Sequence, residues 1–369
     1  MRTAGGQVIQ GHEVRSARIE GLRGVGSTGV LVAHVFGVSV SYGVYAYDTL
    51  LHRLLLGAGF GAFVLLSLSG YLLALPFFRR DFDGGAEVSL RRYARNRVLR
   101  VFPLYYAVLV VVMLTQEHGG HLGQWWRFLT FSQNFSPSTV GQVDGPMWTL
   151  VDELHFYLLL PPLAWLLGRL SRGHLAPAAL ALGALAGLSI LTEVLWVENH
   201  PHPDLVLAYS TPANFFYFIA GMLVALAHVF VDRRGSLPGL LGRSDAWCAA
   251  ALLTWFVVCW RYRDFALLAL VSMFTLAGTV LPLRPGVLAP ILSARVLAAV
   301  GVASYSLYLW HYPIVTWLGA HAALHSFGVL LLTAGSLSVI VALLSYRFIE
   351  APFLRMRRRW SPAAARQES

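Results

Sequence analysis

Ten apolar runs dominate the chain, and each is long enough to cross the roughly 30 Å hydrocarbon core of a bilayer as a helix. The runs cover residues 22–42, 55–78, 99–116, 147–168, 175–196, 212–231, 246–260, 265–283, 296–319 and 327–349. A soluble domain cannot hide so much apolar surface, because 57% of the residues are hydrophobic and 12% are charged, against about a quarter charged in an ordinary soluble domain. The sequence therefore predicts an all-α polytopic membrane protein with about ten transmembrane helices.

The distribution of arginine predicts the orientation of these helices. Arginine supplies all 28 basic residues, and an even number of spans puts both termini on one side. With that side taken as the cytoplasm, the arginines on the opposite side are only Arg53, Arg127, Arg261 and Arg263. We therefore expect a cytoplasmic segment at residues 1–20, a membrane domain at 21–354 and a basic cytoplasmic tail at 355–369. The net charge of +10 follows from this bias, so we expect no nucleic-acid partner.

The first apolar run contains two ionisable residues in the stretch GLRGVGSTGVLVAH. Arg23 and His34 lie on one face of a helix, about 16 Å apart along its axis. An ionisable side chain inside a span is a functional candidate, although a histidine that hydrogen-bonds two helices together is the structural alternative. Small residues between the two either leave room for a narrow ligand or allow close helix packing; they are Gly24, Gly26, Ser27, Gly29 and Ala33.

A second polar group lies in WTLVDELHFY, at the start of the fourth run. Thr149, Glu153 and Tyr157 form a stripe at helical spacing. The adjacent carboxylates of Asp152 and Glu153 are hard to place in lipid, so we expect one to face the bundle interior and the other the external interface. A carboxylate beside a histidine commonly positions a general base, whereas polarity at a helix end is the structural alternative.

Two further groups complete the candidates. Arg97 and Arg100 share a helix face at the start of the third run, where guanidinium groups suit phosphate binding as well as membrane topology. His311 lies inside the ninth run, two residues before Pro313, in a belt of tyrosines that includes Tyr305 and offers a structural role instead. No metal-site spacing such as HExxH occurs, so we expect no metal.

Six short motifs follow one another along the chain and carry a resemblance. They are IEGLRG with Arg23 and His34, LSGY at 68–71, Arg97 and Arg100 before FPLYY, WTLVDELHFY at 148–157, YSLYLWHYP at 305–313 and YRFIEAPF at 346–353. In this order they resemble the bacterial membrane acyltransferase family 3, multi-pass O-acyltransferases, over residues 19–354. The chain departs from the family pattern at Glu20, Thr149, Asp152 and Ala351. Because Asp152 replaces a usually apolar residue, the two adjacent carboxylates can exchange roles.

The resemblance implies transfer of an acyl group from acyl-CoA, acetyl-CoA above all, to a hydroxyl of a sugar, envelope glycan or secondary metabolite, in the bacterial cytoplasmic (inner) membrane. It implies that Arg23, Arg97 and Arg100 bind the coenzyme's phosphates. His34 then acts as general base or carries the acyl group, and Glu153 orients it. The residues expected to support the substrate are Trp148, Thr149, Asp152, Tyr157, Tyr305 and His311.

A proton-coupled secondary transporter is the alternative function, since intramembrane histidines and a carboxylate suit that role too. Transporters of this kind usually consist of two repeated halves, and no repeat is visible in the sequence. The sequence leaves the acceptor, the acyl length and the association of several copies into a homo-oligomer open.

Overall fold

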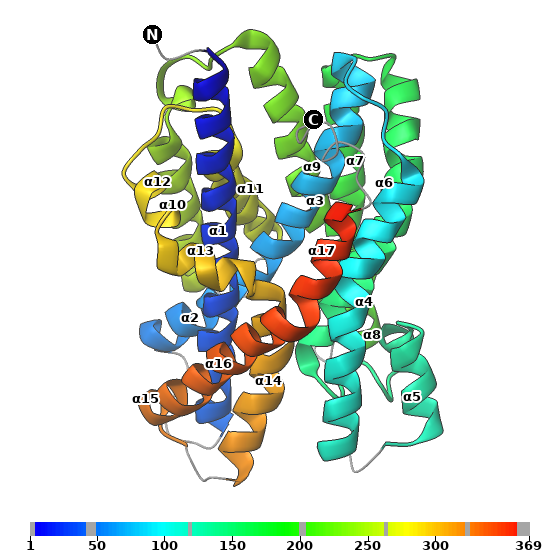
Figure 1. Ribbon diagram of the computed structural model, residues 1–369, viewed down its shortest axis with the longest axis vertical. Coiled ribbons are helices and arrows are strands. Elements are labelled where there is room, and N and C mark those ends of the chain that lie inside the picture. Colours follow the sequence, from blue (N-terminus) through cyan, green and yellow to red (C-terminus); the bar gives the residue numbers. More distant parts are fainter. Residues whose placement is uncertain are drawn as a thin grey trace.

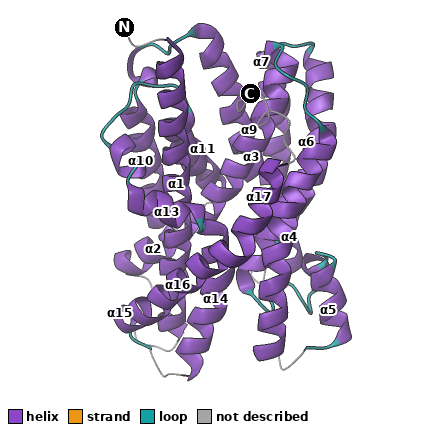
Figure 2. Ribbon diagram, viewed as in Figure 1, coloured by secondary structure: helices purple, strands orange, loops and turns teal. Residues whose placement is uncertain are grey.

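The structure, a computed structural model, describes residues 4–41, 49–116, 120–198, 204–261, 265–321 and 325–359, and the regular elements in these ranges are helices (Figures 1 and 2). Within them, seven helical segments are long and apolar enough to cross a membrane: Ser16–Ser41, Leu50–Asp83, Leu90–Thr115, Gly145–Ser171, Leu175–Val197, Leu205–Arg234 and Phe327–Met356. The prediction of an all-α polytopic membrane protein is confirmed. The three other predicted spans correspond to shorter or less apolar helices, so the count of ten and the cytoplasmic termini stay predictions.

The N-terminal two thirds of the chain form the long helices on both sides of the molecule (Figure 1). Their bounds are α1 (Ala4–Ser41), α2 (Leu50–Gly57), α3 (Gly61–Asp83), α4 (Leu90–Thr115), α5 (Leu122–Leu129), α6 (Trp148–Ser171), α7 (Leu175–Glu193), α8 (Leu205–Ala208) and α9 (Thr211–Arg234). Helix α1 begins well before residue 22, so residues 4–20 continue the first span as one helix. Helix α4 begins nine residues before the predicted 99, because Ser89 caps it by accepting from the Arg92 N–H.

The C-terminal third is more broken. It comprises α10 (Ser244–Arg261), α11 (Phe265–Val280), α12 (Leu288–Leu292), α13 (Arg295–Val302), α14 (Ser304–His321), α15 (Phe327–Leu330), α16 (Ser336–Ser345) and α17 (Ala351–Arg359), with π-helical turns at Leu331–Gly335 and Tyr346–Glu350. The predicted span 296–319 is therefore two helices, which part at Ala303 and run in different directions (Figure 1). The tail at 355–369 is helical as far as Arg359, and residues 1–3 and 360–369 lie outside the described ranges.

Close packing of small residues joins α3 to α9. A Cβ atom on Gly70 would collide with the backbone of Phe218, and one on Gly221 would collide with the backbone of Ser67. Ser67 also donates a hydrogen bond across the contact to the Tyr217 carbonyl, at 2.7 Å. Such contacts hold helices together in lipid, where the hydrophobic effect gives no net drive for association.

The same principle decides the role of the small residues in α1. A Cβ atom on Gly24 would meet the backbone of Leu297, and one on Gly29 would meet the backbone of Ala58. These glycines therefore serve close helix packing, not a channel for a narrow ligand. The sequence left two roles open for the small residues of α1, and the structure supports close helix packing.

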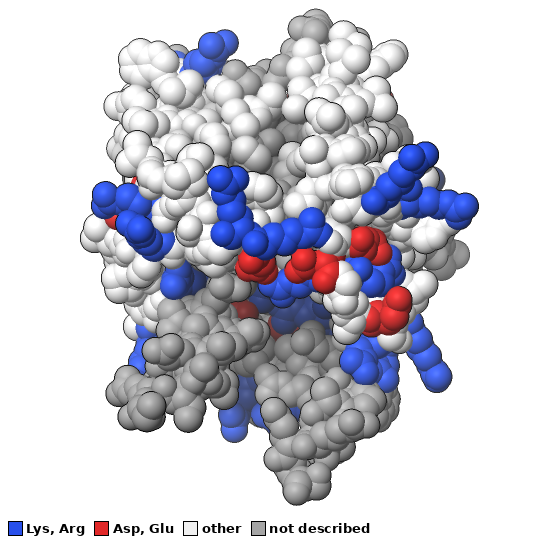
Figure 3. Space-filling model, turned by 90° about the horizontal axis from the view of Figure 1, so that it is seen from above, with Lys and Arg blue, Asp and Glu red and all other residues white. Residues whose placement is uncertain are grey.

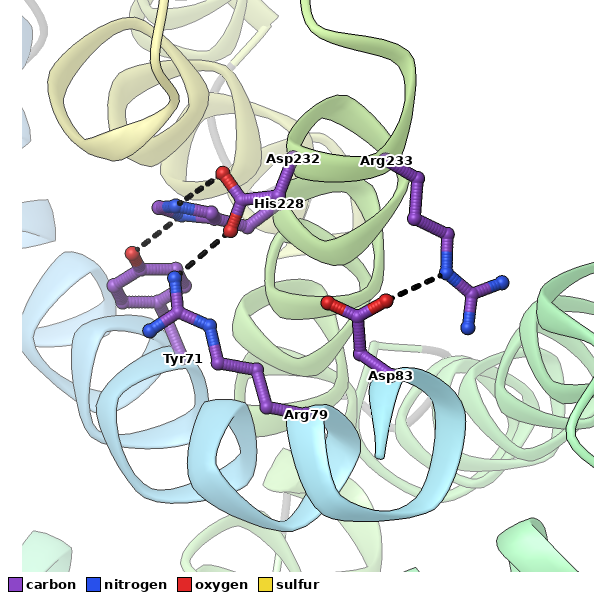
Figure 4. Close-up of polar contacts among 6 residues, drawn as sticks. All are labelled: Tyr71, Arg79, Asp83, His228, Asp232 and Arg233. Atoms are coloured by element: carbon purple, nitrogen blue, oxygen red, sulfur yellow. Dashed lines mark hydrogen bonds and ion pairs between the residues drawn. The ribbon is translucent and has the colours of Figure 1, made fainter. Parts of the chain in front are cut away.

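Polar contacts also fasten α3 to α9 at their ends (Figure 4). The buried Tyr71 hydroxyl bonds Nδ1 of His228 at 2.7 Å. Two ion pairs lie beyond it, Arg79 with Asp232 at 2.9 Å and Arg233 with Asp83 at 3.0 Å. Arginine and acidic side chains gather in a band across this end of the molecule, the end that carries the N-terminus (Figure 3). We call it the upper end.

Candidate active site

A pocket of about 110 Å³ lies at the centre of the bundle and gathers most of the predicted site residues. It is bounded by α1, α3, α4, α6 and α14, and we call it the central pocket. The predicted residues that line it are Arg23, Arg97, Arg100, Thr149, Glu153, Tyr157 and Tyr305. The stripe of Thr149, Glu153 and Tyr157 thus faces inward as the helical spacing predicts.

Arg100 is held by a carboxylate from the far end of the chain. Its guanidinium donates to Glu350 Oε1, and Ser306 donates to the other oxygen of that carboxylate at 3.0 Å. Glu350 ends a π-helical turn, a distortion common at functional sites. The Arg100 guanidinium also lies over the Tyr305 ring, 5.5 Å from its centroid. Sequence reasoning did not select Glu350, although the motif YRFIEAPF contains it.

The other two arginines of the pocket differ in their partners. Arg23 forms an ion pair with Glu20, one helical turn earlier, at 3.0 Å. Arg97 lies over the Tyr157 ring at 5.5 Å, and its buried Nε has no hydrogen-bond partner. Among the described residues, Arg97 forms no ion pair with a carboxylate. It is therefore the guanidinium of this pocket best able to accept an incoming anion.

The two adjacent carboxylates of α6 point in different directions. Glu153 faces the central pocket and accepts a hydrogen bond from Ser69, in the LSGY motif, at 2.7 Å. Asp152 faces α9 instead, where Thr211 donates to it at 2.7 Å. The structure thus assigns the interior position to Glu153. The expectation that the other carboxylate faces the external interface is wrong, because Asp152 is fully buried against α9.

His34 pairs with His311 and not with Glu153. Its Nδ1 lies 2.9 Å from Nε2 of His311. Nδ1 of His311 lies 3.1 Å from the Leu307 carbonyl, which can only accept a hydrogen bond. A neutral His311 therefore carries its proton on Nδ1 and accepts at Nε2, so a neutral His34 donates from Nδ1. This leaves the lone pair on Nε2 of His34, the state that a general base requires.

Tyr308 connects the central pocket to this histidine pair. Its ring lines the pocket and lies 5.8 Å from the His311 ring. Its hydroxyl shares a hydrogen bond of 2.9 Å with Thr149. The Tyr312 ring packs edge-on against His34, with a centroid separation of 5.1 Å. The pocket and the pair are thus separated by one aromatic layer.

A second cavity, of about 360 Å³, continues from the central pocket between α3 and α4. The two share Leu72, Leu73 and Arg97 as lining residues. The exposed Arg92 and the partly buried Asn96 also line it. Since α3 ends and α4 begins at the upper end, this cavity leads from the upper end to Arg97, and we call it the upper cavity.

Two residues near the site lie apart from both cavities. Trp148 stacks on Tyr209 at 4.7 Å, and its carbonyl accepts from Asn134, so it helps to fix the loop before α6. In that loop, Asp144 is buried, and neither carboxylate oxygen has a hydrogen-bond partner among the described residues. Burial raises the pKa of the Asp144 carboxyl well above its usual range. In the part of the chain that the structure describes, no group of three His, Cys, Asp or Glu side chains could hold a metal ion.

Comparison with known proteins identifies the family. A family model described as an acyltransferase domain matches residues 16–347. The chain belongs to this acyltransferase family. The resemblance expected from the six motifs is confirmed, and with it a multi-pass membrane protein.

Curated relatives carry the same type of name. The O-acetyltransferases OatA of Staphylococcus aureus strains NCTC 8325 / PS 47 and COL are each 23% identical to this chain over 371 residues. The alignments cover 90% of this chain and 56% of each relative. The chain thus spans about half the length of the curated relatives it matches. No solved structure matches the chain.

Proposed function

We propose that the protein is an O-acyltransferase of the bacterial cytoplasmic membrane. It moves an acetyl or other short acyl group from acyl-CoA to a hydroxyl of a sugar, an envelope glycan or a secondary metabolite. Membership of the acyltransferase family and the names of the relatives support acyl transfer to oxygen. One observation carries the proposal: α1 holds an oriented imidazole, His34, and also contributes Arg23 to the arginine-lined central pocket nearer the upper end.

The donor enters from the upper end, which we take as the cytoplasmic side. Arg97 lines both the upper cavity and the central pocket and is free of a carboxylate partner there, so it binds a phosphate of the coenzyme with Arg92 at the entrance. Arg23 and Arg100 add positive charge behind it, although each is partly neutralised by a glutamate. The pantetheine arm then extends toward Tyr308 and the histidine pair.

The acyl group is transferred from the thioester to the acceptor hydroxyl at the histidine pair. Nε2 of His34 takes the proton of the acceptor hydroxyl, and the hydroxyl oxygen attacks the thioester carbonyl. The carbon–sulfur bond breaks, and the proton passes from His34 to the departing thiolate to give free coenzyme A. His311 acts as a positioning residue because it fixes the tautomer of His34.

A deletion strain tests the proposal in the cell. Envelope glycans and secreted metabolites are compared by mass spectrometry in the deletion strain and after complementation with the wild-type chain or with His34→Ala at matched membrane levels. We expect one class of molecule to lose an acyl group in the deletion strain and to regain it only with the wild-type chain. Full recovery with His34→Ala would remove the assigned role of His34.

Thioester consumption by purified protein separates this proposal from the transporter alternative. In detergent micelles no ion gradient exists, and a transporter would release no thiol from acetyl-CoA. An acyltransferase given acetyl-CoA and the acceptor still releases free coenzyme A. The exposed His174→Ala serves as a matched control, because it removes a histidine outside both cavities. Absence of thiol release from the wild-type protein would count against acyl transfer.

A further inference from the structure

A second polar cluster lies on the other side of α6, away from the reaction path proposed above. His155 Nδ1 lies 2.6 Å from the Thr211 hydroxyl, and that hydroxyl donates to Asp152 Oδ1 at 2.7 Å. With Asp152 ionised, the one proton of the Thr211 hydroxyl goes to the carboxylate, so a neutral His155 donates from Nδ1. The lone pair of His155 is then on Nε2, which has no hydrogen-bond partner among the described residues.

This cluster ends in an apolar groove between α6, α7 and α9. The groove has a volume of about 650 Å³, and His155 and Thr211 line it. Most of its wall is aliphatic or aromatic, including Leu163, Leu166, Leu185 and Leu188. Leu166 and Leu188 are exposed at the surface of helices that cross the membrane. The groove is therefore open to the lipid, and its walls suit an apolar chain.

The buried carboxylate shows that the cluster is costly to keep. Asp152 is 0% exposed, and its Oδ2 atom has no hydrogen-bond partner within the ranges that the structure describes. A carboxylate buried in a membrane helix with incomplete hydrogen bonding is unfavourable, and such groups usually have a function. A single hydrogen bond between α6 and α9 would require only Thr211 and Asp152. The structure extends the chain to His155, which lines the groove.

We propose that this groove binds a long-chain alcohol from the membrane, with its hydroxyl donating to Nε2 of His155 and its hydrocarbon chain along the leucines of α6 and α7. An acceptor nitrogen selects a donor head group, so an alcohol fits where an ether or a phosphodiester, which offer only acceptors, does not. The site is separate from the central pocket, and no bond is made or broken in it.

Photocrosslinking tests the site. The full chain in nanodiscs is irradiated with a diazirine-bearing dodecan-1-ol, and labelled peptides are identified by mass spectrometry. We expect saturable labelling of α6 and α7 that unlabelled dodecan-1-ol displaces about tenfold better than its methyl ether, the difference that one buried hydrogen bond makes. Equal displacement by the two would show a groove that takes any lipid chain, and labelling that never saturates would show no site. Either result overturns the proposal.

Variants locate the bound alcohol. His155→Phe should abolish the preference for alcohol over ether, whereas His174→Phe, at the exposed start of α7, should keep it. Leu188→Trp should fill the groove and remove labelling by either head group, and labelling that survives it would place the ligand elsewhere. Thr211→Val should weaken the preference, while Thr211→Ser retains the hydroxyl and should restore it. If Thr211→Val and Thr211→Ser behave alike, the hydrogen-bonded chain plays no part in binding.

Discussion

His34 and His155 are both oriented by a hydrogen bond at Nδ1, but their surroundings differ. Each imidazole has Nδ1 engaged by a buried neighbour, His311 in one case and Thr211 in the other, so each leaves Nε2 as an acceptor. His34 lies next to a pocket with three arginines, where a charged donor substrate can bind. His155 lines a groove of leucines that faces lipid. An oriented imidazole is therefore not sufficient evidence for catalysis, because the surroundings decide what can reach it.

The partners of the two histidines differ in a second way. The hydrogen-bonded chain from His34 passes through His311 to the Leu307 backbone carbonyl, whereas the chain from His155 ends on the buried Asp152. With only a neutral imidazole beside it, a protonated His34 readily gives its proton to the departing thiolate. The carboxylate at the end of the other chain makes His155 a stronger acceptor of a hydrogen bond. Since a carboxylate also suits a general base, the lipid-facing groove of leucines, and not the hydrogen-bond partner, is what distinguishes His155 from His34.

The largest expected effect separates the two histidines by function. His34→Gln should lower thiol release from acetyl-CoA by a factor of about 10² to 10⁴, the range for loss of a general base. The same variant should still bind the alcohol probe in the apolar groove between α6, α7 and α9, because that groove shares no lining residue with the central pocket. Comparable turnover in His34→Gln and wild type would contradict the catalytic assignment of His34 and thus its contrast with His155.

Replacing the partner of His34 should have the next largest effect. His311→Phe leaves the His34 ring without its acceptor, and we expect turnover to fall about tenfold to a hundredfold with little change in KM for acetyl-CoA. His311→Asn offers a side-chain oxygen in place of Nε2 and should recover part of the rate. If both variants lose activity equally and their melting temperatures fall together, His311 has a packing role only.

Arg97 tests whether the surroundings of His34 select the donor. Arg97→Ala should raise KM for acetyl-CoA about tenfold, since one charge-assisted hydrogen bond to phosphate is lost, and should change kcat little. With acetyl-pantetheine, which has no phosphate, wild type and variant should behave alike. Arg169→Ala, exposed near the end of α6, is the matched control. An equal loss with both donors would mean that Arg97 supports the pocket without binding phosphate.

The last prediction concerns stability and not activity, at Asp144, a buried carboxylate whose oxygens have no hydrogen-bond partner in the described part of the chain. Because burial raises its pKa in the folded protein, the unfolded chain ionises first, and stability is lost as the pH rises from about 4 toward the folded-state pKa. Asp144→Asn cannot ionise, so its advantage over wild type should grow by up to about 1.4 kcal/mol per pH unit in that window.

Thermal unfolding in detergent, measured between about pH 5 and pH 8, checks this difference. The exposed Asp204→Asn should show a difference from wild type that does not change across the same range. A difference for Asp144→Asn that is equally constant with pH would mean that the carboxylate is ionised in the folded protein.

Much of the fold follows from the sequence because lipid imposes a simple pattern. The run at 212–231 corresponds to α9 and the run at 246–260 to α10 within three residues at each end. The break at Ala303 was not predictable in this way, since the apolar run continues through it and carries no proline there. The break between α13 and α14 accompanies the close packing of α13 on α1. A Cβ atom on Gly301 would collide there with the backbone of Glu20.

The sequence by itself determined an all-α membrane protein, its family, and the helix faces that carry Arg23, Arg97 and Glu153, because hydrophobic length and helical spacing are local properties. Only the tertiary structure decided which side chains meet. Neighbouring positions on a helix point about 100° apart, so Asp152 and Glu153 enter different sites according to which helices pack on either side. His34 and His311 are 277 positions apart in the chain, and no local pattern can indicate that they share a hydrogen bond.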